Sequence, residues 1–437
     1  MQMRRYFSIC LTALSLLFLA FAQTHPVAAQ GPGRGQAAVI SPEIAPDGRV
    51  TFRLRSANAK EVTVNGIGAP LPMAKDAQGI WSAMTPSPLA PDIYSYTFSM
   101  DGIRGPDPSN QYAAWAVASA ARAGSSTLLI PGVPWSTSDV PHGAVARHEY
   151  KSTIIGGPEV YYVYTPPGYE AKRSQAYPVV VMLHGLGDTA PDWILQGGAN
   201  LTLDNLIAGG KATPMILVSP SSYGTPGGAT GAAAGFPNFT KALIGEILPQ
   251  VEKEYNASKK ASEHAIGGLS MGAAQSLLAL SHTDQFEWIS SFSPGFDMYD
   301  GMWRAMSGAT GASGAGGGRG GGAGGGFGAS GGRGGGAFGA SGGRGGPLRQ
   351  RAVLGAGILE NIFPTLDARA NANIKLLYIS CGTADDHLNL TRQFRDFLSS
   401  KQIKLTYYEA PDMAHVWPFW RQQFAEFASL LFKPRPR

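Results

Sequence analysis

The chain has 437 residues, of which 44% are hydrophobic and 15% are charged. This balance is typical of a globular protein and excludes disorder throughout, and the length favours two folded units. The formal net charge of +5 is too small and too dispersed to indicate a nucleic-acid partner.

Residues 1–29 have the pattern of a secretory signal peptide. Arg4 and Arg5 precede an apolar run, and small residues allow cleavage after Ala22 or after Ala29. We favour the second position. An uncleaved anchor is the alternative, but the run of about 17 residues is short for a membrane span, which needs roughly 20. We therefore expect a secreted or periplasmic protein that has no membrane contact once the signal peptide is removed.

Cysteine usage fits export without a disulfide. Cys10 lies in the leader, so only Cys381 would remain in the mature chain. The mature fold must then be stabilised by packing.

Residues 38–132 predict a small all-β sandwich. Val50–Leu54 and Ile93–Phe98 alternate between apolar and polar residues, and the turn pair Asp101-Gly102 follows the second run. Short strands at this spacing, separated by turn residues, are typical of two packed sheets.

Residues 145–437 have a different pattern, in which strands and helices alternate. Val179–Leu183 and Leu376–Cys381 are almost continuously apolar, and a helical stretch covers Phe239–Tyr255. Strands of this kind are buried on both faces, which predicts an α/β domain with a mostly parallel sheet.

A Gly-rich insert at 308–346 interrupts this domain. The nine-residue unit Phe327–Gly335 recurs intact at Phe338–Gly346. Such a segment lacks the apolar area to offset its chain entropy, so we expect a disordered surface loop. It could cover the pocket, but its composition favours a passive tether, and its few arginines do not make it an RNA-binding segment.

The motif Gly268-Leu269-Ser270-Met271-Gly272 follows a predicted strand and precedes a predicted helix. In this context G-x-S-x-G forms a nucleophile elbow, a sharp turn that exposes the serine hydroxyl and requires small flanking residues. Ser270 is therefore the candidate nucleophile.

A serine nucleophile needs a histidine base and an acid that orients it, and in α/β-hydrolases these follow in the order acid, then histidine. Asp385 comes directly after a late strand and is the candidate acid, with Asp386 as the alternative. His415 lies in the loop after the last strand and is the candidate base. The remaining histidines near these motifs are expected at the surface: His264, His282 and His387.

Two backbone N–H groups are expected to bind the oxyanion. Met271 follows the nucleophile, and Leu186 lies in the tight turn that begins at His184 after an apolar strand. His184 is expected to brace this turn.

Four aromatic residues could line the acyl or sugar pocket, although packing is an equally good interpretation. They are Trp193, Tyr223, Trp417 and Trp420. No spacing of ligands indicates a metal, and no cofactor is expected.

Six ordered motifs together resemble carbohydrate esterase family one, which includes feruloyl and acetyl xylan esterases and is related to enterochelin esterases. They are His184–Asp188, Trp193, Asp204–Ile207, Gly267–Gly272, Cys381–Asp385 and His415–Arg421. The preceding segment, with Gly79–Ser82 and Leu89–Phe98, resembles the immunoglobulin-like modules grouped with family 48 carbohydrate-binding modules. The chain departs from the family at Met413-Ala414, where members often have two glycines.

The resemblance implies an α/β-hydrolase with the triad Ser270, Asp385 and His415. It also implies hydrolysis of acyl esters on plant-wall polysaccharide or oligosaccharide, as in a feruloyl or acetyl xylan esterase. Two alternatives remain open: a siderophore ester hydrolase of the enterochelin esterase type, and a carbohydrate-binding protein without activity.

Overall fold

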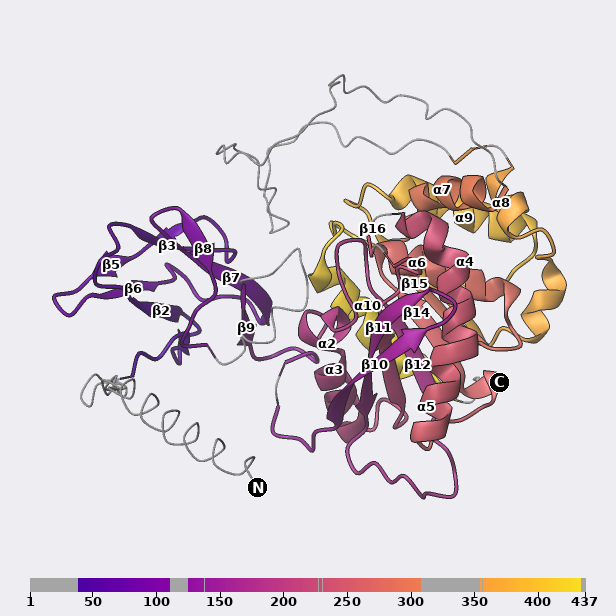
Figure 1. Ribbon diagram of the computed structural model, residues 1–437, viewed down its shortest axis with the longest axis horizontal. Helices are drawn as coiled ribbons and strands as arrows, with labels where there is room; N and C mark the ends of the chain where they lie inside the picture. Colours follow the sequence, from indigo (N-terminus) through magenta and orange to yellow (C-terminus); the bar gives the residue numbers. More distant parts are fainter. Residues whose placement is uncertain are drawn as a thin grey trace, which may run out of the picture. The chain divides into compact units, whose positions relative to one another are not determined.

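The computed structural model describes residues 38–110, 125–136, 138–226, 228–229, 231–307, 354–355 and 357–433 (Figure 1). Contacts within the chain separate Met1–Val39 from Ile40–Arg437, and only the second unit is considered below. The predicted signal peptide and Gly-rich insert lie outside the described residues and stay predictions. Across the described ranges, no helix combines the length and the apolar character that a membrane crossing requires.

In the N-terminal part, residues 38–110 and 125–136 are described, and their regular elements are all strands. One sheet has the order β1-β2-β6-β5, and another has the order β4-β3-β7-β8, with β9 paired to β7. The bounds are β1 Glu43–Ile44, β2 Val50–Arg55, β3 Val62–Asn65, β4 Leu71–Pro72, β5 Ala74–Lys75, β6 Ile80–Met84, β7 Asp92–Met100, β8 Ile103–Gly105 and β9 Ser126–Ile130.

Alternating side chains of these strands fill a separate apolar core. Along β2, Val50, Phe52 and Leu54 are buried, while the residues between them are partly exposed. Trp81 and Tyr96 are buried in the same core. The apolar and polar residues that alternate in the sequence therefore point to opposite faces of the strands, and the apolar face points into the core. The immunoglobulin-like class of this part stays a prediction.

The second part is organised around one eight-stranded sheet with the order β10-β11-β13-β12-β14-β15-β16-β17. The bounds are β10 Ala144–Ser152, β11 Gly157–Thr165, β12 Val179–Leu183, β13 Ile216–Pro220, β14 His264–Gly268, β15 Trp288–Phe292, β16 Leu376–Gly382 and β17 Thr406–Ala410.

Most of this sheet is parallel. The hairpin β10-β11 is antiparallel and joins β13 in antiparallel register. From β13 to β17 every pairing is parallel. The predicted α/β fold with a mostly parallel sheet is confirmed. One consequence matters for function: β12, β14, β16 and β17 all end at the same edge.

Helices cover both faces of the sheet, as Figure 1 shows. The α-helices are α2 Asp192–Leu195, α3 Ala199–Ala208, α4 Ala232–Ala242, α5 Leu248–Glu254, α6 Ser270–Leu277, α7 Asp297–Ser307, α8 Ile358–Ile362, α9 Leu388–Ser400 and α10 Trp417–Leu430. A π-helix, η2 (Leu243–Ile247), joins α4 to α5, and three 3₁₀ segments are η3 Ala261–Glu263, η4 Leu278–Ser281 and η5 Ala368–Ala372.

The alternation of side chains along each strand divides the interior into two cores. On β12, Val179 and Val181 pack with residues of α4 to α9, whereas Val180 and Met182 pack with residues of α2, α3 and α10. Because both faces are covered, the central strands are apolar at nearly every position. This explains the continuous apolar runs in the sequence.

Candidate active site

The turn that carries Ser270 has the geometry of a nucleophile elbow. Ser270 is the first residue of α6 and has a φ angle of 53°, in the left-handed region that non-glycine residues rarely adopt. A Cβ added at Gly272 would lie 2.4 Å from the Leu183 carbonyl oxygen, and one at Gly268 would lie 2.6 Å from the Gly272 backbone. Both glycines are therefore required, because no side chain fits there. The start of α6 also favours negative charge at Ser270.

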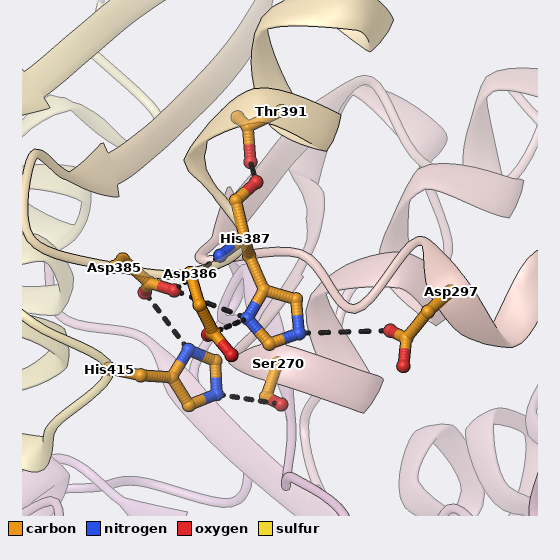
Figure 2. A network of polar contacts seen from close by, with 7 residues as sticks. All are labelled: Ser270, Asp297, Asp385, Asp386, His387, Thr391 and His415. Atoms are coloured by element: carbon orange, nitrogen blue, oxygen red, sulfur yellow. Dashed lines mark hydrogen bonds and ion pairs between the residues drawn. The ribbon is translucent and has the colours of Figure 1, made fainter. Parts of the chain in front are cut away.

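Three side chains form a hydrogen-bonded line at this edge of the sheet (Figure 2). His415 Nε2 lies 3.0 Å from Ser270 Oγ, and His415 Nδ1 lies 2.9 Å from Asp385 Oδ2. A carboxylate only accepts, so Nδ1 carries the proton and Nε2 is free to accept one from the serine. The structure thus brings together the three residues that the sequence proposed as a triad.

The buried carboxyl group of Asp385 is kept ionised by its partners. Burial alone would raise the pKa of Asp385, but hydrogen bonds from His387 and His415 outweigh it and hold the pKa well below the usual range. The neighbouring Asp386 is turned toward His387, with 3.0 Å between Oδ1 and Nδ1. Geometry therefore favours Asp385 over Asp386 as the partner of His415.

Two histidines expected at the surface are buried instead. His264, the first residue of β14, is 2% exposed, and its Nε2 lies 2.6 Å from the Ser258 carbonyl oxygen. His387 is 5% exposed and lies against His415. The prediction was wrong for both, because local sequence does not reveal which loops pack over a sheet edge.

The loop that follows β12 passes beside the nucleophile. A Cβ added at Gly185 would lie 3.5 Å from Ser270 Cβ, and the Leu186 side chain is 56% exposed. Met271, in the first turn of α6, has no intrahelical acceptor for its N–H. Gly185 and Met271 therefore lie on either side of the serine, and oxyanion binding by the N–H groups of Leu186 and Met271 stays a prediction.

Tyr223 and His184 hold this loop in place. The Tyr223 hydroxyl accepts from the Gly187 N–H at 3.0 Å and donates to the Asp188 carbonyl at 2.6 Å. Burial raises the pKa of Tyr223 to about 12, so the hydroxyl keeps its proton.

His184 is fully buried between two backbone groups. Nδ1 donates to the Gly185 carbonyl at 2.8 Å, and Nε2 accepts from the Ser222 N–H at 3.1 Å. Burial lowers the pKa of His184 to about 4, which keeps the ring neutral and suited to this bracing contact.

The four aromatic residues proposed to line the pocket are all enclosed. Trp193 is 0% exposed, and its Nε1 donates to the Leu183 carbonyl at 2.8 Å, which favours packing over substrate contact for this residue. Trp417 and Trp420 are buried in the same core, and the Trp420 ring meets His415 edge-on at 4.9 Å. Tyr223 braces the loop. Packing around the sheet edge, which the sequence pattern does not encode, decides these roles.

In the part of the chain that the structure describes, one group of His and Asp side chains is close enough to hold a metal ion. The ligand atoms of Asp385, Asp386, His387 and His415 lie within 4.8 Å of one another. These atoms are hydrogen-bonded among themselves and to Ser270. We interpret the group as the surroundings of the triad and not as a metal site.

One family model matches a segment of this chain. Residues 152–315 match the family model described as "Putative esterase". This match covers less than half of the chain and is a similarity within the α/β part, residues 144–433. The match includes the elbow and ends before Asp385 and His415.

Among curated proteins, this chain is similar to an endo-1,4-beta-xylanase/feruloyl esterase of Xylanibacter ruminicola. The two are 29% identical over 272 residues, which cover 58% of this chain and 36% of that protein. The chain therefore matches only about a third of the length of this relative.

Solved structures share the α/β fold of this chain. A CE1 ferulic acid esterase from Anaeromyces mucronatus is 20% identical, with a TM-score of 0.50, and covers 69% of this chain and 96% of its own. The enterobactin esterase from Shigella flexneri is 15% identical, with a TM-score of 0.51. The match covers 87% of this chain and 92% of that protein. At these identities the likeness concerns the fold alone. The α/β-hydrolase fold that the resemblance implied is confirmed.

Proposed function

We propose that this chain is a secreted serine esterase that hydrolyses acyl esters on plant-wall polysaccharide, such as feruloyl or acetyl esters of xylan. The observation that carries the proposal is the hydrogen-bonded line Ser270–His415–Asp385 at a glycine-flanked elbow. The xylanase/feruloyl esterase relative supports the choice of substrate. The pattern of residues 1–29 supports secretion.

The reaction proceeds in two halves through an acyl-serine. His415 Nε2 takes the proton of Ser270 Oγ as the oxygen attacks the ester carbonyl, and Asp385 stabilises the imidazolium that forms. The N–H groups of Met271 and Leu186 bind the oxyanion. His415 then protonates the leaving alcohol, and water, deprotonated by the same histidine, attacks the acyl-serine to release the acid.

The first experiment tests the nucleophile with p-nitrophenyl acetate. Ser270→Ala should lower kcat by about 10⁴-fold or more, because residues of a triad act as a unit. The variant should keep the melting temperature of the wild type. If Ser270→Ala retained a tenth of the wild-type activity, the assignment of Ser270 as the nucleophile would be wrong. Absence of activity in the wild type would favour a carbohydrate-binding protein.

A second experiment separates the two candidate acids. Asp385→Asn should greatly lower kcat, since it removes the acceptor of His415 Nδ1 and the correct tautomer with it. Asp386→Asn is the matched control and should keep most of the activity. The reverse result would assign the acid to Asp386.

A siderophore ester is the second candidate substrate. The enterobactin esterase structure covers 87% of this chain, a share that residues 145–437 alone cannot supply. Its likeness therefore extends into the N-terminal all-β part. A panel of feruloylated xylan, acetylated xylan and a catecholate siderophore ester would decide, with the highest kcat/KM expected on a xylan ester.

A further inference from the structure

His387 lies against the proposed base, although nothing in the reaction above uses it. Its ring stacks on that of His415, with 4.5 Å between centroids and 21° between planes. Its backbone is fixed as well, because the Thr391 hydroxyl donates to the His387 carbonyl at 2.9 Å. Figure 2 shows the His387 ring with Asp385, Asp386 and His415 on one side and Asp297 on the other.

Both nitrogens of His387 face carboxylates. Nδ1 lies 3.1 Å from Asp385 Oδ1 and 3.0 Å from Asp386 Oδ1, and Nε2 lies 3.7 Å from Asp297 Oδ1 on α7. A neutral imidazole has one N–H, so one of its lone pairs would point at a carboxylate. Only the imidazolium satisfies both sides. Burial lowers the pKa of His387, but Asp297, Asp385 and Asp386 outweigh it and raise the pKa to about 11.

This arrangement also fixes the orientation of Asp385. Its Oδ1 accepts from the His387 backbone N–H at 2.9 Å and from His387 Nδ1. Its Oδ2 is left for His415 Nδ1. Each carboxylate oxygen thus has its own donor, and rotation of the group would break contacts on both sides.

We propose that His387 is a positioning residue of the esterase site, which aims Asp385 at His415 and places a fixed positive charge against the His415 ring. The inference rests on the proposed function. The base must be neutral to accept the serine proton, and a cation stacked on its ring opposes premature protonation. Hydrolysis then extends to lower pH than it would without His387.

Other charges around the two rings act on the protonation of His415 as well. In the described part of the chain, the groups that face His387 are Asp385 and Asp386 from the loop after β16, Asp297 from α7, and His415 from the loop before α10. The carboxylates all favour protonation of His415. Within this set, His387 alone opposes protonation of His415. Removing its charge should therefore make His415 easier to protonate.

The test is the pH profile of kcat/KM on p-nitrophenyl acetate, from about pH 4 to about pH 9. His387→Gln keeps an N–H donor for Asp385 but removes the charge. We expect the acidic limb to move up by about 1 pH unit, because a neighbouring charge typically shifts a titration by that much or more. His282→Gln is the matched control, in a half-buried turn after η4. A limb that coincides with that of the wild type would overturn the inference.

A second measurement is independent of activity. NMR of ring-labelled histidine in the Ser270→Ala variant should show that His387 stays protonated up to about pH 9. This is well above the usual histidine pKa of about 6.5. Titration of His387 near neutral pH would refute the proposed charge, even if His387→Gln failed to fold. Failure of the proposed function would show differently, as wild-type hydrolysis that is absent or unaffected by Ser270→Ala.

Discussion

Tyr223→Phe removes the hydroxyl that joins two backbone groups of the loop after β12. The hydroxyl bonds to the Gly187 N–H at 3.0 Å and to the buried Asp188 carbonyl at 2.6 Å. At about 1 kcal/mol for each net hydrogen bond, the free energy of unfolding should fall by about 2 kcal/mol. The phenyl ring still fills the site, so no cavity adds to this loss.

The same change should lower the rate of hydrolysis. Loss of an entire oxyanion donor costs about 10²-fold to 10³-fold in kcat. Tyr223→Phe leaves the Leu186 N–H in place but loosens its loop, so a fall of about 10-fold is expected, with little change in KM. Stopped assays on p-nitrophenyl acetate and urea unfolding measure the two effects on one preparation.

Tyr378→Phe is the matched control for this prediction. Its buried hydroxyl donates to Gln423 Oε1 at 2.8 Å, in the core on the α10 side of the sheet. This variant should lose about 1 kcal/mol of stability and keep its kcat. If Tyr223→Phe also kept wild-type kcat despite a stability loss, the hydroxyl would brace the fold alone and the reasoning about the loop would be refuted.

Three further outcomes are expected. Gly272→Ala should prevent folding, seen as loss of soluble protein, because the added Cβ meets a β12 carbonyl oxygen at 2.4 Å; Gly245→Ala, whose nearest neighbour would be a side-chain carbon at 3.6 Å, should fold normally. Trp193→Phe should lower the melting temperature without changing KM, and a raised KM would restore its substrate role. His387→Gln should lower the free energy of unfolding most below about pH 6.5. The difference from the wild type should shrink as the pH rises toward about 11, the pKa of His387, because His387 then loses its proton. A difference that grew with pH would contradict this sign.

The elements that carry the chemistry could be predicted because each has a local pattern. The elbow is marked by glycines on both sides of Ser270 between a strand and a helix. Asp385 and His415 follow the segments that become β16 and β17, and parallel strands bring such positions to one edge. Chain order alone allowed either Asp385 or Asp386 as the acid. In the structure Asp385 contacts His415, whereas Asp386 is turned toward His387.

The residues around these positions could not be predicted from local patterns. His387 follows Asp385 by two positions, and its sequence context resembles that of a surface turn. Its burial depends on Asp297 and His415, which come from distant segments. Trp193 and Tyr223 were recognisable as large aromatic residues. Whether such a ring faces the pocket or the core depends on the packing of helices against the sheet.

The backbone of Ser270 is in the left-handed region, which lowers stability at the position where the chemistry needs a hydroxyl. A non-glycine residue at a φ of 53° costs about 1 kcal/mol or more, and glycine adopts this conformation freely. Ser270 is kept in spite of this cost only if its hydroxyl is used. A duplicated copy of this domain that was released from hydrolysis would gain stability by exchanging this serine for glycine. The residue at position 270 therefore distinguishes, in any descendant of this chain, an elbow whose serine hydroxyl is still used from one that is kept only as part of the fold.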